Sequence, residues 1–145
     1  MSEPTRVLFL CTGNSCRSHM AEGFLRSMAG DRAESLSAGA APAGSVHPKA
    51  IEVMSEVGVD ISEQSSKHID LFLPPQGTPP DVIVAVCSSA DENCPVFPAD
   101  VRRLHWPFDD PAHATGSDAE ILSEFRRVRD EIQQRLTARL DELIR

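Results

Sequence analysis

The sequence predicts an α/β fold: a three-layer domain with a central, mostly parallel four-stranded sheet. Two observations predict it. Short apolar runs alternate with segments of helical periodicity throughout the chain, which is the pattern of strand–helix–strand units. The run 81–86 (DVIVAV) is almost entirely apolar and β-branched, as in strands that are covered on both faces. A length of 145 residues suits one core, so we expect a single domain over 1–145.

Four short segments are the expected strands. They lie at 6–10, 34–37, 81–86 and 101–106. Cys11 follows the first of these strands and Cys87 ends the third. Because ligands bind beyond the carboxyl ends of parallel strands, we expect both thiols at the same functional edge of the sheet.

The first two helices are indicated by apolar spacing and by their end residues. The first contains Met20, Ala21, Phe24, Leu25 and Met28 at helical intervals, and Gly30 follows it. The second helix begins at Pro48, a residue that suits a first helical turn, and ends at Gly58. We expect its inward face to carry Ile51, Met54 and Val57.

The remaining segments are a short helix, a loop and a long helix. The short helix is expected within 65–73, and the loop at 74–80, which holds four prolines. Ser117 and Glu120 form an S-x-x-E capping box for the last helix. An apolar stripe runs along this helix and is made of Ile121, Phe125, Val128, Ile132, Leu136, Leu140 and Leu143.

The charge balance excludes some function classes. Lys and Arg number 14 and Asp and Glu 22, which gives a net charge of −8. A general nucleic-acid binder or a polybasic membrane binder would need a positive face. No signal peptide or membrane-spanning run fits the sequence. We therefore expect a cytoplasmic monomer without nucleic-acid or membrane partners.

Four cysteines are the candidate reactive groups: Cys11, Cys16, Cys87 and Cys94. In a reducing cytosol, cysteines are buried apolar residues, metal ligands or reactive thiols. Four residues separate the first pair and six the second, which does not match the close pairs of zinc sites. The five histidines likewise show no ligand spacing, so we expect no metal site.

The segment Cys11-Thr12-Gly13-Asn14-Ser15-Cys16-Arg17-Ser18 (CTGNSCRS) is a C-x5-R loop between a strand and a helix. A loop of this length can aim the backbone N–H groups of residues 12–17 at one centre, and the helix adds its positive end. Arg17 supplies a planar fork for two oxygens of a tetrahedral oxyanion. The same dipoles favour a Cys11 thiolate, to which Ser18 donates a hydrogen bond.

This loop, together with Asp109-Asp110-Pro111, resembles the low-molecular-weight protein tyrosine phosphatase superfamily. The resemblance runs from about Val7 to the final helix. Further matches resemble its thioredoxin-coupled arsenate reductase branch: Ser37-Ala38-Gly39, Val46-His47-Pro48, Val86-Cys87-Ser88, Cys94-Pro95 and His105-Trp106-Pro107-Phe108.

The resemblance implies roles for individual residues. Cys11 matches the nucleophile, Arg17 the oxyanion clamp, Ser18 the hydroxyl that steadies the thiolate, and Asp110 the general acid. By spacing alone, Asp110 is equally well explained as a turn residue before Pro111. The resemblance gives Cys16 no redox step, so we expect buried packing there, and a structural role for Asp109.

Cys87 and Cys94 match two relay thiols. The resemblance therefore implies arsenate detoxification: arsenate is reduced to arsenite at Cys11, and the electrons pass through Cys87 and Cys94. Because exchange requires sulfur-to-sulfur approach, we expect the polar segment 88–93 to change conformation on oxidation. Paired relay thiols favour thioredoxin as the electron donor, although glutaredoxin or a small thiol would also satisfy the sequence.

Two alternatives use the same loop. A phosphatase needs only Cys11, Arg17 and Asp110, but here Ala112 and His113 follow the Asp-Pro pair where phosphatases usually place aromatic residues, and the chain has no tyrosine. A non-catalytic oxyanion or thiol sensor would stop after one event.

In some relatives, residues matching Asn14, Glu22 and Ser37 help to hold a potassium ion. The acidic residue that completes that site appears here as Lys67. We therefore expect no tightly bound cofactor, and the Lys67 ammonium in place of the ion.

Overall fold

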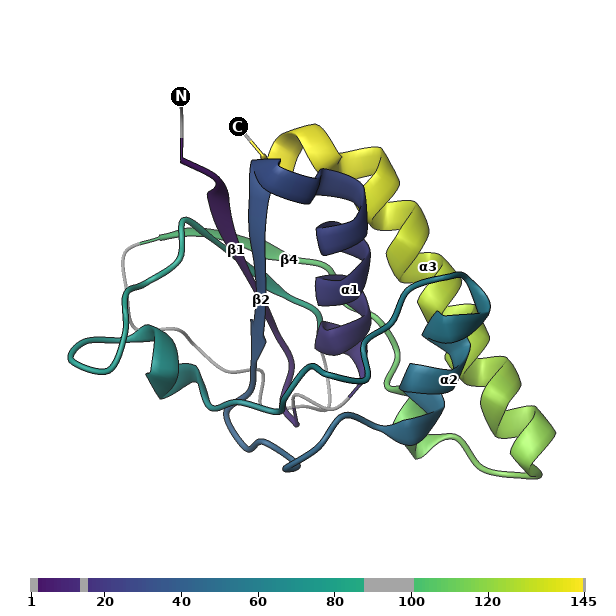
Figure 1. The fold of residues 1–145 in the computed structure, drawn as a ribbon. Helices are drawn as coiled ribbons and strands as arrows, with labels where there is room; N and C mark the ends of the chain where they lie inside the picture. Colours follow the sequence, from purple (N-terminus) through teal and green to yellow (C-terminus); the bar gives the residue numbers. More distant parts are fainter. Residues whose placement is uncertain (1–2, 14–15, 88–100, 145) are drawn as a thin grey trace.

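A four-stranded sheet forms the centre of the molecule (Figure 1). The computed structural model describes residues 3–13, 16–87 and 101–144. The strands are β1 (Thr5–Leu10), β2 (Ala33–Ala38), β3 (Val82–Ala85) and β4 (Arg102–His105). Their order is β2-β1-β3-β4 and every neighbouring pair is parallel, which confirms the predicted fold class.

Helices cover the two faces of the sheet unequally. The α-helices α1 (Arg17–Ala29), α2 (Pro48–Glu56) and α3 (Asp118–Leu143) all lie on one face (Figure 1). The short 3-10 helix η2 (Ile69–Phe72) packs on the other face. Two further 3-10 turns, η1 (Gly30–Arg32) and η3 (Pro111–His113), lead into β2 and towards α3. The fold thus has three layers, one of them thin.

The alternation of side chains along β3 shows why its sequence is apolar throughout. Val82 and Val84 point into the larger core, beneath the three α-helices. Ile83 points into the smaller core on the opposite face, together with Phe72 of η2. A strand buried on both faces needs apolar residues at every position, as the sequence pattern predicted.

Two local expectations differ from the structure. Val57 is 39% exposed, because α2 ends at Glu56 and Val57 lies beyond the helical turn that faces the core. Val53 is buried there instead. The second difference lies in the predicted loop, because Arg17 and Ser18 already form the first turn of α1. Their side chains are therefore fixed by a helix.

The long helix α3 begins with the capping box that the sequence predicted. The Ser117 hydroxyl accepts a hydrogen bond from Glu120 N at 3.2 Å, and the Glu120 carboxylate accepts one from Ser117 N at 3.1 Å. Five residues of the predicted stripe are buried: Phe125, Val128, Ile132, Leu136 and Leu143. None of the helices in the described part of the chain is both long and apolar enough to cross a membrane.

Candidate active site

The segment that joins β1 to α1 lies at the carboxyl edge of the sheet and is tied to the chain after β2. Cys11 N donates to the carbonyl of Ala38 at 3.3 Å. The carbonyls of Thr12 and Gly13 accept hydrogen bonds from the backbone at 41 and 43, at 3.0 and 2.8 Å. These bonds direct the two carbonyls towards the 39–43 segment. Asn14 and Ser15, which were predicted to contact the oxyanion, lie outside the described residues.

Cys11 and Ser18 lie side by side within this segment. Their Sγ and Oγ atoms are 2.9 Å apart. Cys11 is 2% exposed and Ser18 is fully buried. A hydroxyl at this distance donates a hydrogen bond to a thiolate, and a charge-assisted bond of this kind is stronger than a neutral one. The contact therefore has the geometry expected for a hydroxyl that steadies a nucleophilic thiolate.

The Arg17 guanidinium is buried and held by the chain after β4. One terminal nitrogen donates to the carbonyl of Phe108 at 3.1 Å, and the other lies 3.4 Å from Oδ2 of Asp110. Arg17 is only 2% exposed. A buried guanidinium needs such partners, because an uncompensated charge is costly in the interior. The structure thus brings Arg17 and Asp110, which are far apart in the sequence, into direct contact.

Asp110 is the centre of a small polar cluster. Its Oδ1 accepts a hydrogen bond from Ala112 N at 3.0 Å, which caps η3. The same oxygen is 3.5 Å from the Cys16 thiol, and Oδ2 is 3.6 Å from Nε2 of His113. The turn-residue explanation and the general-acid explanation of Asp110 are therefore compatible, since one carboxylate caps the turn and faces Arg17. Its side chain keeps 17% exposure.

Cys16 differs chemically from Cys11. Burial raises the pKa of its thiol well above the ordinary value, and the charge of Asp110 raises that pKa further. Cys16 is therefore a protonated thiol at neutral pH, able to donate to the Asp110 carboxylate. It is 4% exposed and belongs to the larger core, in agreement with the packing role expected from the sequence.

Cys87 follows β3, and Cys11 follows the neighbouring strand β1. Val86 N donates to the carbonyl of Leu10 at 2.8 Å, so the two cysteines directly follow a bonded pair of neighbouring strands. Cys87 is fully buried, and His105 Nε2 donates to its carbonyl at 2.9 Å. Both thiols therefore lie at the predicted edge. Cys94 and the segment 88–93 lie outside the described residues.

The described cysteines have different redox states. Cys87 is disulfide-bonded, whereas Cys11 and Cys16 carry free thiols.

A second polar cluster lies between α1 and β2. The Ser37 hydroxyl donates to Oε1 of Glu22 at 2.5 Å, and Arg26 lies 3.8 Å from the other carboxylate oxygen. Burial raises the pKa of Glu22, while Ser37 and the nearby charges of Lys67 and Arg26 oppose that shift. Glu22 and Lys67 line one pocket of about 430 Å³. Glu22, one of the residues matched to a cation site, thus shares a pocket with the Lys67 ammonium.

The five histidines have separate surroundings. His19 is buried in α1, and its Nδ1 accepts a hydrogen bond from the Gln64 side-chain amide at 2.9 Å. The Nδ1 atoms of His47 and His68 cap α2 and η2. Among residues 3–13, 16–87 and 101–144, no three His, Cys, Asp or Glu side chains gather as a metal site would require.

Phe108 was not identified as a site residue from the sequence. It contributes its backbone carbonyl to Arg17, and no residue pattern encodes such a contact. The only signal was its position two residues before Asp110 within the matched segment 105–111.

The comparisons with known proteins agree with this geometry. The family model described as low molecular weight phosphotyrosine protein phosphatase matches residues 6–145. The chain belongs to this family. Among its phosphatase-family relatives, arsenate reductase 2 of Staphylococcus saprophyticus is 50% identical over 130 residues, which are 90% of this chain and 92% of that protein.

Solved structures with a similar fold also carry arsenate reductase names. An arsenate reductase in its phosphate-binding state has a TM-score of 0.76 and 32% identity, covering 96% of this chain and 98% of the other. A thioredoxin-dependent arsenate reductase from Corynebacterium glutamicum has a TM-score of 0.61 and 28% identity, covering 94% of this chain and 64% of that one. This phosphatase-family fold is thus shared with proteins that carry arsenate reductase names.

Proposed function

We propose that this phosphatase-family chain is an arsenate reductase that uses three thiols and is regenerated by thioredoxin. The observation that carries the proposal is the arrangement of Cys11 and Cys87 directly after neighbouring parallel strands, together with the Arg17–Asp110 pair at the start of α1. A hydrolytic phosphatase would need Cys11, Arg17 and Asp110, but it would not need a second thiol. The names and identities of the relatives support the same reaction.

The oxyanion binds to backbone N–H groups of residues 12–17 and to the Arg17 fork. Arg17 is aimed by the Phe108 carbonyl and Asp110, so little rotamer freedom is lost when an oxyanion arrives. In an acidic chain with net charge −8, this local group of donors supplies the attraction that the molecule as a whole lacks.

In the first step, the Cys11 thiolate attacks arsenic. An S–As bond forms, an As–O bond breaks, and Asp110 protonates the departing oxygen, which leaves as water. The product is an arsenate ester of Cys11 in which arsenic is still pentavalent. Ser18, 2.9 Å from the sulfur, stabilises the thiolate before attack.

In the second step, the Cys87 thiolate attacks the Cys11 sulfur. The S–S bond forms, the S–As bond breaks, and its electron pair goes to arsenic, which leaves as trivalent arsenite. Cys94 then attacks the Cys87 sulfur and releases Cys11 as a thiolate. Two electrons from the thioredoxin dithiol reduce the resulting Cys87–Cys94 disulfide. The free Cys11 beside a disulfide-bonded Cys87 supports this order.

Lys67 takes the place of a monovalent cation in this proposal. The residues available do not fit a potassium ion, because a lysine ammonium faces the Glu22 carboxylate in the pocket that they share. Turnover is therefore expected to be equal in potassium and sodium buffers of the same ionic strength. Marked activation by potassium would contradict this assignment.

We also propose that the protein works as a cytoplasmic monomer with no tightly bound cofactor. The proposed reaction needs Cys11 and Cys87 in their reduced forms, which suits a reducing compartment.

The decisive experiment follows NADPH oxidation with arsenate, thioredoxin and thioredoxin reductase. The wild type is expected to turn over continuously. Cys94→Ser is expected to release about one equivalent of arsenite per protein and then stop, because Cys11 and Cys87 supply only two electrons. Cys87→Ser is expected to release none, since nothing attacks the Cys11 ester.

The other outcomes separate the alternatives. Continuous turnover by Cys94→Ser would assign the last exchange to an external thiol. Absence of arsenite from the wild type would refute the reductase. Hydrolysis of p-nitrophenyl phosphate would then identify a phosphatase, and binding without turnover a sensor.

A further inference from the structure

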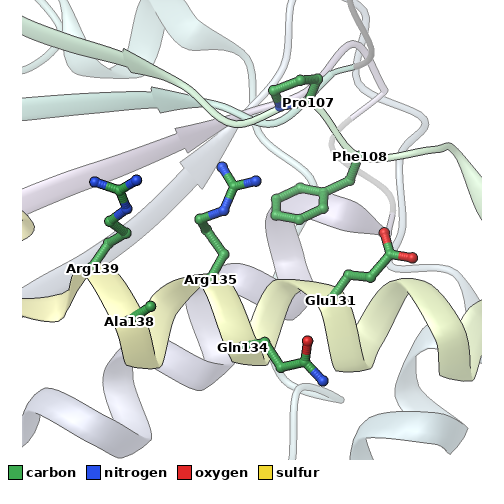
Figure 2. Close-up of a pocket in the computed structure, with 7 residues that line it drawn as sticks. All are labelled: Pro107, Phe108, Glu131, Gln134, Arg135, Ala138 and Arg139. Atoms are coloured by element: carbon green, nitrogen blue, oxygen red, sulfur yellow. The ribbon is translucent and has the colours of Figure 1, made fainter.

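A pocket of about 380 Å³ lies between α3 and the segment that follows β4. Figure 2 shows Arg135 and Arg139 rising from α3 on one side of Phe108, whose ring lies beside the Arg135 side chain. The pocket adjoins the site described above, because the backbone of Phe108 is the same backbone that holds Arg17. It therefore offers a link between an α3 side chain and the oxyanion clamp.

The Arg135 guanidinium contacts two aromatic rings. Its central carbon is 5.7 Å from the centroid of Phe108 and 5.8 Å from that of Trp106. Both rings are buried in the larger core. Within the part of the chain that the structure describes, Arg135 has no carboxylate or carbonyl partner. Cation–π contact is thus its interaction with the protein.

Phe108 is held at both backbone ends as well as at its ring. Its N–H donates to the Val86 carbonyl at 3.3 Å, which extends the β3–β4 ladder. Its carbonyl accepts from Arg17 at 3.1 Å. Loss of packing against the Phe108 ring would therefore loosen the segment whose carbonyl aims Arg17. Two residues further along, the same segment carries Asp110, which faces the second nitrogen of Arg17.

We propose that Arg135 is a positioning residue for oxyanion binding. By packing on Phe108 and Trp106, it fixes the direction of the Phe108 carbonyl and so the orientation of Arg17. Arg135 touches neither the substrate nor Arg17, and acts through Phe108 alone. The proposal deepens the proposed arsenate reductase function and rests on it for the substrate, but the binding of any tetrahedral oxyanion would depend on Arg135 in the same way.

Arg139 provides a matched control. It lines the same pocket one helical turn further along α3 and carries the same charge. Its guanidinium pairs with Glu142 at 3.2 Å instead of contacting a ring. Replacing Arg139 therefore removes one positive charge from the pocket and leaves Phe108 untouched.

The test measures the dissociation constant of inorganic phosphate by calorimetry on the reduced protein, below the unfolding transition, together with arsenate turnover. Arg135→Gln is expected to weaken phosphate binding and raise the KM for arsenate by about fivefold, as loss of a cation–π contact allows. Arg135→Lys, which keeps a cation over the rings, is expected to stay within about twofold of the wild type. Arg139→Gln is expected to bind phosphate as the wild type does.

Three results would overturn the proposal. One is unchanged phosphate affinity in folded Arg135→Gln, which would leave Arg135 with a packing role only. Another is equal weakening by Arg139→Gln, which would indicate a general effect of charge. The third is failure of Arg135→Lys to restore affinity. If instead the wild type does not reduce arsenate but phosphate affinity follows the expected pattern, the proposed function fails and the positioning role stands.

Discussion

Replacing Asp110 with Asn separates two properties of this carboxylate. The Asn oxygen still accepts the 3.0 Å hydrogen bond from Ala112 N, and Asn caps helix starts about as well as Asp. The turn at η3 should therefore persist. The proton donor is lost, and so is the negative charge 3.4 Å from Arg17.

The loss of the proton donor should lower the rate of the reaction, whereas the loss of the negative charge should raise the affinity for an oxyanion. A positioned general acid contributes about 10²–10⁴-fold to a reaction, so kcat/KM for arsenate should fall by roughly that factor in Asp110→Asn. Removal of the carboxylate also removes its repulsion of a bound oxyanion. Phosphate should consequently bind about two- to tenfold more tightly, since a partly exposed charge pair contributes about 1 kcal/mol.

Asp109→Asn is the matched control, because it removes the adjacent negative charge. Asp109 pairs with Arg127 at 3.0 Å on the surface, and its side chain is 73% exposed. The coupled NADPH assay gives kcat/KM and calorimetry gives the phosphate affinity. Retention of more than a tenth of kcat/KM by Asp110→Asn would refute the general-acid assignment, as would an equal loss in Asp109→Asn.

Three further predictions follow. Ser18→Ala removes the 2.9 Å contact to Cys11 and should slow alkylation of Cys11 by iodoacetamide at pH 7 by about tenfold; an unchanged rate would contradict the role of the hydroxyl. Burial raises the pKa of Glu22 above its ordinary value of 4.5. Between these two pKa values the folded state retains a proton that the unfolded state has lost. The free energy of unfolding should therefore fall as pH rises from 4.5 through the raised pKa. Glu22→Gln should flatten this fall in urea titrations at pH 5 and 8, and a steeper fall would be inconsistent with a raised pKa. Arg129 is buried and donates to the Val53 carbonyl at 2.9 Å and to Glu56 at 2.8 Å, so Arg129→Ala should reduce the free energy of unfolding by about 2–3 kcal/mol. Arg126→Ala removes another, more exposed partner of Glu56 and should reduce the free energy of unfolding by less than Arg129→Ala does in the same urea titration; equal losses would contradict the role of burial.

Much of the fold was predictable because it depends on local patterns. The uninterrupted apolar run of β3, Gly30 after α1 and the Ser117–Glu120 box each encode an element or its end within a few residues. Val57 was placed incorrectly because helical spacing does not indicate where the last turn ends. The side of the sheet on which each helix packs was likewise not encoded in any one segment.

Part of the site was predictable for the same reason. Cys11, Arg17 and Ser18 lie within one short motif, and the structure shows the contact of Cys11 with Ser18 that the motif indicates. The placement of Asp110 against Arg17 depends on 92 intervening residues, and only the family resemblance indicated it. The contact of Arg135 with Phe108 joins α3 to the chain after β4, and no spacing rule links those two positions.

The hydrogen bond from Val86 N to the Leu10 carbonyl means that strand pairing positions the backbones of Cys11 and Cys87. Each cysteine follows the end of its strand closely, so the length of these short connections sets how far each sulfur lies from the paired backbones. A residue inserted between Ala85 and Cys87 would thus move Cys87 away from the position that the strand pairing gives it, while every residue remained present. Any redesign of this segment must therefore keep its length.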